Sequence, residues 1–101
     1  MKIVNFAKVI YNLKGDALKD PDTNEVAMLS KIIGNILAQH KATDAIRQFA
    51  VAEKIYNSEG DIDLEDADFK MVETVAKETN LSCMTAKVLQ ECLKTAKDKQ
   101  G

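Results

Sequence analysis

The sequence contains few of the residues from which enzyme and metal sites are built. Its 101 residues include a single histidine, His40, and only two cysteines, Cys83 and Cys92. A structural zinc site needs four ligands, usually in closely spaced pairs, and nucleophilic catalysis needs a base beside the nucleophile. No glycine-rich phosphate loop follows a predicted strand. We therefore expect no catalytic residues, no metal site and no cofactor.

Long apolar runs are also missing. The longest strongly apolar stretch, residues 32–38, is interrupted by Gly34 and Asn35 and falls far short of the roughly 20 residues that a transmembrane helix needs. The first residues carry Asn5 and Lys8 where a secretory signal would be apolar. We expect a cytoplasmic protein with no membrane partner.

The two cysteines lie nine residues apart on one predicted helix. At about 100° per residue this spacing places them on opposite faces, where they cannot form a disulfide with each other. Both are expected to be free thiols, as is usual in a reducing compartment.

Composition indicates a single globular domain over residues 1–101, because 46% of the residues are apolar and 30% are charged. Residues 1–27 combine β-branched and aromatic side chains with turn signals around Gly15 and Pro21, which predicts a β-rich flap. Residues 28–97 have helical periodicity, and residues 98–101 are expected to fray. The predicted class is mainly α, in detail α+β: a short N-terminal β-hairpin or strands packed on about four helices.

The four predicted helices are separated by polar breaks. The first begins near Met28 and ends near His40, and the second runs from the N-cap Thr43 to about Asn57. The third begins near Glu65, with Asp63 as its cap, and the fourth begins after the N-cap Ser82.

The second predicted helix carries apolar residues on more than one side. Its expected buried face consists of Ala45, Ile46, Phe49, Ala52 and Tyr56. This choice leaves Val51 and Ile55, together with Met71 of the third helix, outside the buried stripes. Such leftover apolar residues allow a homodimer that buries them.

Acidic residues are concentrated in residues 59–78, which hold eight acids and two lysines for a net charge of −6. Gly60 and Ile62 have the spacing of an EF-hand loop, but that register places Ile55 at the first ligand position, which needs an oxygen. We therefore favour a protein partner over a cation. The candidate partner-binding residues are Glu59, Asp61, Asp63, Glu65, Asp66 and Asp68.

Residues 75–89 resemble the helix-turn-helix of bacterial repressors. Ala76 matches the small residue where the two helices touch, Asn80 the left-handed turn position, Leu81 the apolar position after it, and Ser82 the cap of the second helix. The resemblance implies a DNA-facing set of Ser82, Cys83, Met84, Lys87 and Gln90. Because the preceding segment carries net −6 and repels phosphates, a DNA-binding regulator is the alternative function.

A broader pattern covers most of the chain. It comprises Ile10-x-x-Leu13-x-Gly15-x-x-Leu18-x-Asp20, an apolar helix, and Ala52-Glu53-Lys54-Ile55-Tyr56-Asn57 leading into Gly60-Asp61-Ile62-Asp63-Leu64. In this pattern the chain resembles small uncharacterised proteins of tailed phages and prophages. The resemblance implies a non-enzymatic accessory protein in the host cytoplasm. Such a protein acts by protein–protein interaction, as a morphogenesis factor or as an inhibitor of a host factor.

Overall fold

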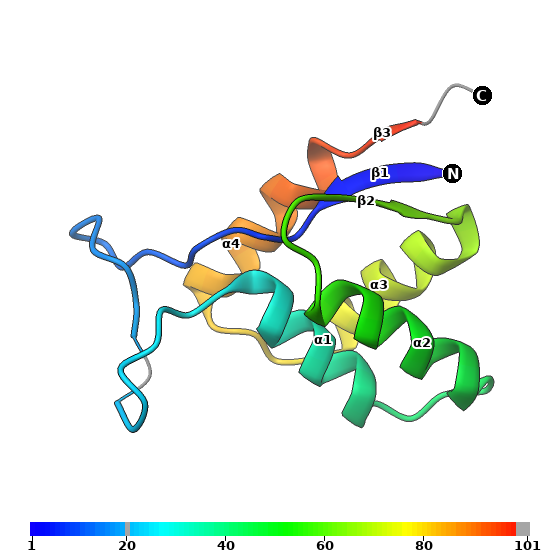
Figure 1. Ribbon diagram of the computed structural model, residues 1–101, viewed down its shortest axis with the longest axis horizontal. Helices are drawn as coiled ribbons and strands as arrows, with labels where there is room; N and C mark the ends of the chain where they lie inside the picture. Colours follow the sequence, from blue (N-terminus) through cyan, green and yellow to red (C-terminus); the bar gives the residue numbers. More distant parts are fainter. Residues whose placement is uncertain (20, 99–101) are drawn as a thin grey trace.

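The computed structural model describes residues 1–19 and 21–98. A three-stranded antiparallel sheet lies along one side of the molecule, and four helices gather beside it (Figure 1). Along the chain the elements are β1 (Lys2–Asn5), α1 (Leu29–Gln39), α2 (Ala45–Tyr56), β2 (Asp61–Leu64), α3 (Asp66–Glu78), α4 (Cys83–Lys94) and β3 (Lys97–Asp98). The predicted class, mainly α within α+β, is confirmed.

The sheet joins the start of the chain to two distant segments. Its order is β2-β1-β3, with Val4 opposite Ile62 and with Ile3 opposite Lys97. Val4 and Leu64 point to the helices and are buried, because alternate residues of a strand face opposite sides. Residues 1–27 are therefore not a separate flap, since β1 is the central strand of a sheet made with later segments. Asp98, expected in the frayed tail, belongs to β3, and residues 99–101 lie outside the described residues.

Residues 7–19 and 21–28 form an irregular arm that extends away from the body (Figure 1). Its base is anchored by Ile10, which is completely buried, whereas Leu13 near its tip is fully exposed. The Asn12 side chain accepts hydrogen bonds from the backbone N–H groups of Lys14 and Asp16, and Gly15 adopts φ +88°. The turn signal is thus confirmed, but only isolated bridges form where strands were expected. These bridges pair Val9 with Met28, Tyr11 with Ala17, and Lys19 with Val26.

The helices α1 and α2 pack side by side at close range. A Cβ atom placed on Gly34 would lie 2.7 Å from the Tyr56 Cβ and 3.0 Å from the Ala52 carbonyl oxygen. Glycine is therefore required at this crossing, where the backbone of one helix approaches the other. None of the helices among the described residues has the length and apolar character that crossing a membrane requires.

The buried face of α2 differs from the expected one. Ile46 is 86% exposed, Phe49 52% and Tyr56 38%, and Ala45 is exposed too. The face that packs into the core consists of Gln48, Val51, Ala52 and Ile55. The prediction was therefore wrong except at Ala52. Val51 and Ile55, which were expected to be available for a dimer, are core residues, and Met71 packs half-buried against the core.

A buried amide accounts for this rotation of α2. The Gln48 Nε2 donates to the carbonyl oxygens of Leu37 at 3.0 Å and His40 at 3.2 Å, at the end of α1. The last carbonyls of a helix have no partner within the helix, and leaving them buried and unpaired is costly. Gln48 must therefore face inward, and Ile46 and Phe49 turn outward.

The N-cap residue agrees with the prediction in α4 and differs from it in α2 and α3. Asp44, not Thr43, caps α2 by accepting from the Arg47 backbone N–H at 3.1 Å. Asp63 cannot cap α3, because it lies within β2, and the N-cap position belongs to Glu65. Ser82 caps α4 as predicted, accepting from the Thr85 backbone N–H at 3.2 Å.

Replacing Gln48 with leucine is expected to destabilise the protein by about 1–3 kcal/mol, because two α1 carbonyls lose their donor while apolar volume is kept. Chemical denaturation followed by circular dichroism measures the change. Gln39→Leu, at an exposed position near the end of the same helix, is the control, with an expected change within about 0.5 kcal/mol. Equal effects of the two substitutions would contradict the capping role.

Gly34→Ala is expected to lower the free energy of unfolding by about 1–3 kcal/mol, because the added methyl group collides with α2. The gain in helix propensity, about 1 kcal/mol, offsets part of this cost. Gly60→Ala is the matched control, since a Cβ there meets no atom within 4 Å. A Gly34→Ala protein as stable as the Gly60→Ala protein would show that the helices separate without cost.

Candidate protein-binding surfaces

Three acids of the predicted binding segment are engaged within the protein. The Arg47 guanidinium binds Glu65 at 3.0 Å and Asp68 at 2.8 Å, and the hydrogen bond to Asp68 is the main cause that raises the pKa of Arg47. Asp66 pairs with the amino group of Met1 at 2.9 Å. These carboxylates tie α2 and β1 to the start of α3.

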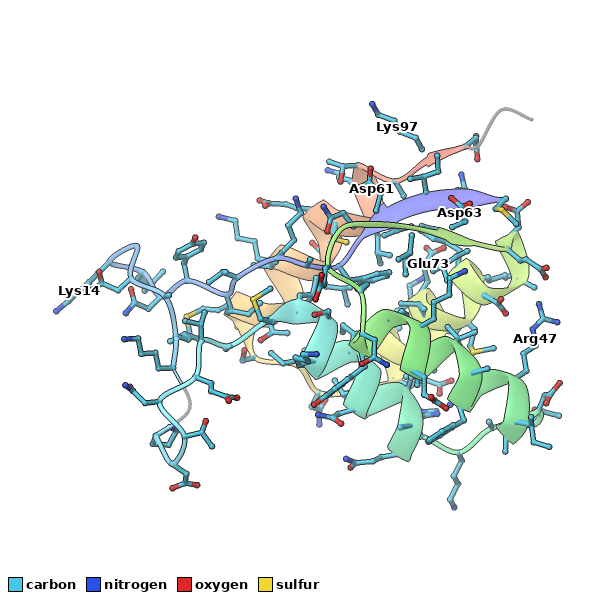
Figure 2. The ribbon with its side chains drawn as sticks, in the orientation of Figure 1. Lys14, Arg47, Asp61, Asp63, Glu73 and Lys97 are labelled. Atoms are coloured by element: carbon cyan, nitrogen blue, oxygen red, sulfur yellow. The ribbon has the colours of Figure 1, made fainter. Side chains whose placement is uncertain are left out.

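The other three acids lie on or beside β2. Asp61 and Asp63 stand opposite Asn5 and Ile3, so they share the outer face of the sheet, and Figure 2 shows both along that strand. Lys54 donates from its ammonium group to the Asp63 carbonyl oxygen. Within the described part of the chain, Glu59 and Asp61 form no ion pair. The six predicted residues are thus divided between internal contacts and the outer sheet face.

The turn between α3 and α4 differs from a repressor-type turn. Thr79 ends α3 in an extended conformation, φ −105° and ψ 137°, while its hydroxyl donates to the Val75 carbonyl oxygen at 2.8 Å. Among the described residues, Asn24 is the one non-glycine residue with positive φ. Asn80 therefore does not adopt the left-handed conformation that was expected. The chain leaves α3 extended because the Thr79 hydroxyl closes the last helical turn itself.

Four of the five residues expected to face DNA are exposed, namely Ser82, Cys83, Lys87 and Gln90, whereas Met84 is half-buried against the core. The Ser82 hydroxyl is occupied by Thr85, whose backbone N–H and side-chain oxygen lie at 3.2 and 2.9 Å. Gln90 lines a groove between the two helices.

That groove has a mainly apolar lining. The groove, of about 420 Å³ and here called the α3–α4 groove, lies between the helices α3 and α4. Its apolar lining consists of Phe69, Ala76, Leu81, Ala86, Leu89 and Leu93. Its polar lining consists of Glu73, Lys77, Gln90 and Lys94. Ala76, expected where two helices touch, instead lines this open groove.

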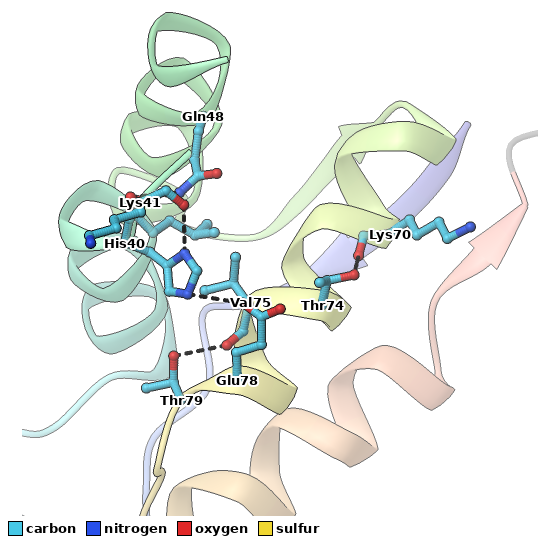
Figure 3. Close-up of polar contacts among 9 residues, drawn as sticks. His40, Lys41, Gln48, Lys70, Thr74, Val75, Glu78 and Thr79 are labelled. Atoms are coloured by element: carbon cyan, nitrogen blue, oxygen red, sulfur yellow. Dashed lines mark hydrogen bonds and ion pairs between the residues drawn. The ribbon is translucent and has the colours of Figure 1, made fainter. Parts of the chain in front are cut away.

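His40 connects the α1–α2 turn to the end of α3 (Figure 3). Its ring Nδ1 lies 2.8 Å from the Lys41 carbonyl oxygen, and its Nε2 lies 3.2 Å from a Glu78 carboxylate oxygen. Both neighbours are hydrogen-bond acceptors, so the ring lies between two oxygen atoms from different segments of the chain. His40 thus lies at the boundary of the core and links the α1–α2 turn to the end of α3.

The two thiols occupy different environments. Cys92 is buried, and its Sγ donates to the Asn5 carbonyl oxygen at 2.9 Å. Burial raises the pKa of Cys92 from 9.0 to about 11. Cys83 is exposed, and both cysteines are free, as predicted.

Within the described ranges, no group of three or more His, Cys, Asp or Glu side chains is arranged to hold a metal ion. Comparison with protein-family models, curated proteins and solved structures gave no match.

A thiol reagent at neutral pH is expected to label one cysteine per folded chain, Cys83, because Cys92 is buried and its thiolate is disfavoured. Cys83→Ser should remove the fast reaction, and denaturant should expose Cys92. The raised pKa of Cys92 also means that stability is retained below pH 9.0 and falls as pH rises toward about 11. Equal native labelling rates for both thiols would contradict the burial of Cys92.

Proposed function

We propose that this chain is a small non-enzymatic protein-binding module of the phage accessory type, acting in the cytoplasm, and that the α3–α4 groove receives an amphipathic helix of a partner protein. The observation that carries the proposal is the apolar lining of this groove, where Phe69, Leu81 and Leu93 remain partly accessible. Water in contact with such side chains is released when an apolar partner covers them.

The dimensions of the groove suit a short helix. Its walls are α3 with 13 residues and α4 with 12, which at 1.5 Å per residue extend for about 18 Å. A helix of about three turns fits that length. It would insert apolar side chains at positions i, i+3 or i+4, and i+7, as in other helix-in-groove complexes.

The charges beside the groove favour an acidic partner helix. Lys77 stands on the α3 side and Lys94 on the α4 side, against one acid, Glu73. Carboxylates flanking the apolar stripe of the partner would meet a lysine on either wall. Rim charges of this kind chiefly increase the association rate and set orientation.

Peptide selection tests the proposal. Helical peptides selected from a randomised library against the folded protein are expected to carry an apolar stripe flanked by Glu or Asp. Ala86→Gln, which fills the groove from α4, is expected to weaken their binding at least tenfold, measured by fluorescence anisotropy. Lys87→Gln, on the neighbouring exposed position of the same helix, should leave binding unchanged.

Two further measurements separate this site from other surfaces. Charge reversal at Asp61 and Asp63 should not alter peptide affinity, because both lie on the sheet. Selected peptides that ignore Ala86→Gln but respond to the charge reversal would move the binding site to the sheet. In an electrophoretic mobility shift at low salt, DNA should not be retarded; retardation lost on Lys87→Gln would favour the DNA-binding alternative.

A further inference from the structure

A second apolar surface lies on the other helix pair. The α1–α2 strip comprises Ala38, Ala42, Ala45, Ile46, Phe49 and Tyr56, all exposed or half-exposed. Ile46, at 86% exposure, and Phe49, at 52%, are one helical turn apart on α2. Isolated apolar side chains are common on surfaces, but large neighbouring ones of this kind mark interaction sites.

The strip contains hollows as well as protruding side chains. One hollow of about 390 Å³ is lined by Ala42, Ala45 and Ile46, and another of about 200 Å³ is lined by Gly34, Ala52 and Tyr56. Ala38 and Phe49 line both hollows, so these lie on either side of Phe49. A protruding aromatic ring and two alanine- or glycine-lined hollows therefore occur on one face.

We propose that the α1–α2 strip is the interface of a homodimer with two-fold symmetry, in which Phe49 of each copy enters a hollow of the other. A symmetric interface uses the same patch on both subunits, so the patch must supply both protrusion and hollow. This strip does so. The small side chains at 38, 42 and 45 allow the helices of the two copies to approach closely.

Charge also favours a second copy as the occupant. The two hollows are lined by Glu53 and His40 as their ionisable residues, and His40 is already engaged by Glu78. At one end, Lys31 is held by the Tyr56 carbonyl oxygen at 2.7 Å and stacks over the Tyr56 ring. The six residues of the strip carry no charge, so they neither repel their own copy nor offer a complement to a charged partner.

The area of the strip sets the strength of the dimer. Aromatic side chains bury about 150–250 Å² each when fully covered, so this partly exposed set buries on the order of 500 Å² per copy. Specific stable interfaces bury about 800 Å² per partner. An interface of this size is expected to be weak and reversible.

Sedimentation velocity over a dilution series from submillimolar to low micromolar protein tests the dimer. The wild type is expected to shift reversibly from dimer to monomer, and Ile46→Lys should be monomeric throughout, with unchanged circular dichroism because Ile46 is 86% exposed. Leu13→Lys, at the fully exposed apolar residue of the arm, is the matched control and should still dimerise. Concentration-dependent amide shifts in NMR spectra should map to α1 and α2.

A wild type that stays monomeric at the highest concentration overturns the proposal. Dimerisation that survives Ile46→Lys, or that disappears with Leu13→Lys, places the contact elsewhere and overturns it as well. Ala86→Gln, which fills the α3–α4 groove, should leave the dimer intact. Ile46→Lys therefore tests the dimer and Ala86→Gln tests the peptide-binding groove, so either proposal can fail without the other.

Discussion

The packing of α2 on α1 depends on which donors bind the last carbonyl groups of α1, which lie beneath α2. The Gln48 amide supplies the donors for Leu37 and His40 from inside the protein, which fixes the rotation of α2 about its axis. Gly34 fixes the separation of the two helices, because their backbones approach so closely at this residue that no room remains for a Cβ atom. Rotation and separation together decide which apolar residues of α2 enter the core. Val51 and Ile55 are buried for this reason, and Ile46 and Phe49 are left outside.

Ion pairs and hydrogen bonds then position α3 and α4. Arg47 holds the start of α3 through Glu65 and Asp68, and His40 meets Glu78 near its end. α3 is therefore held to the α1–α2 pair at both of its ends. α4 is held to β1, where the buried Cys92 thiol donates to the Asn5 carbonyl oxygen. The polar contacts that position these two helices thus lie outside the groove between them.

The sequence predicted the helices well, because polar breaks separate them and two of them begin at side-chain caps, Asp44 for α2 and Ser82 for α4. It predicted the face of α2 badly. Apolar residues surround that helix, so periodicity alone permits several rotations, and the deciding residue is a polar one whose partners belong to another helix. The sequence also did not predict which strands pair with β1. Residues 61–64 and 97–98 are remote from β1 in the sequence, and each of these strands is short. The acidic segment was found correctly as a charge cluster, but counting charges does not reveal which carboxylates meet a cation in the fold.

The distribution of those carboxylates changes what the charge of the segment means. A net charge of −6 over residues 59–78 suggests a surface that attracts a basic partner. In the fold, three of its acids are used at the start of α3, by Arg47 and by the amino group of Met1, and these contacts orient the helix that forms one wall of the α3–α4 groove. Acids in the first turn also suit the positive end of the α3 dipole. Much of the acid thus acts on the fold itself, and the apolar surfaces that this arrangement leaves open are the ones proposed to recognise a partner.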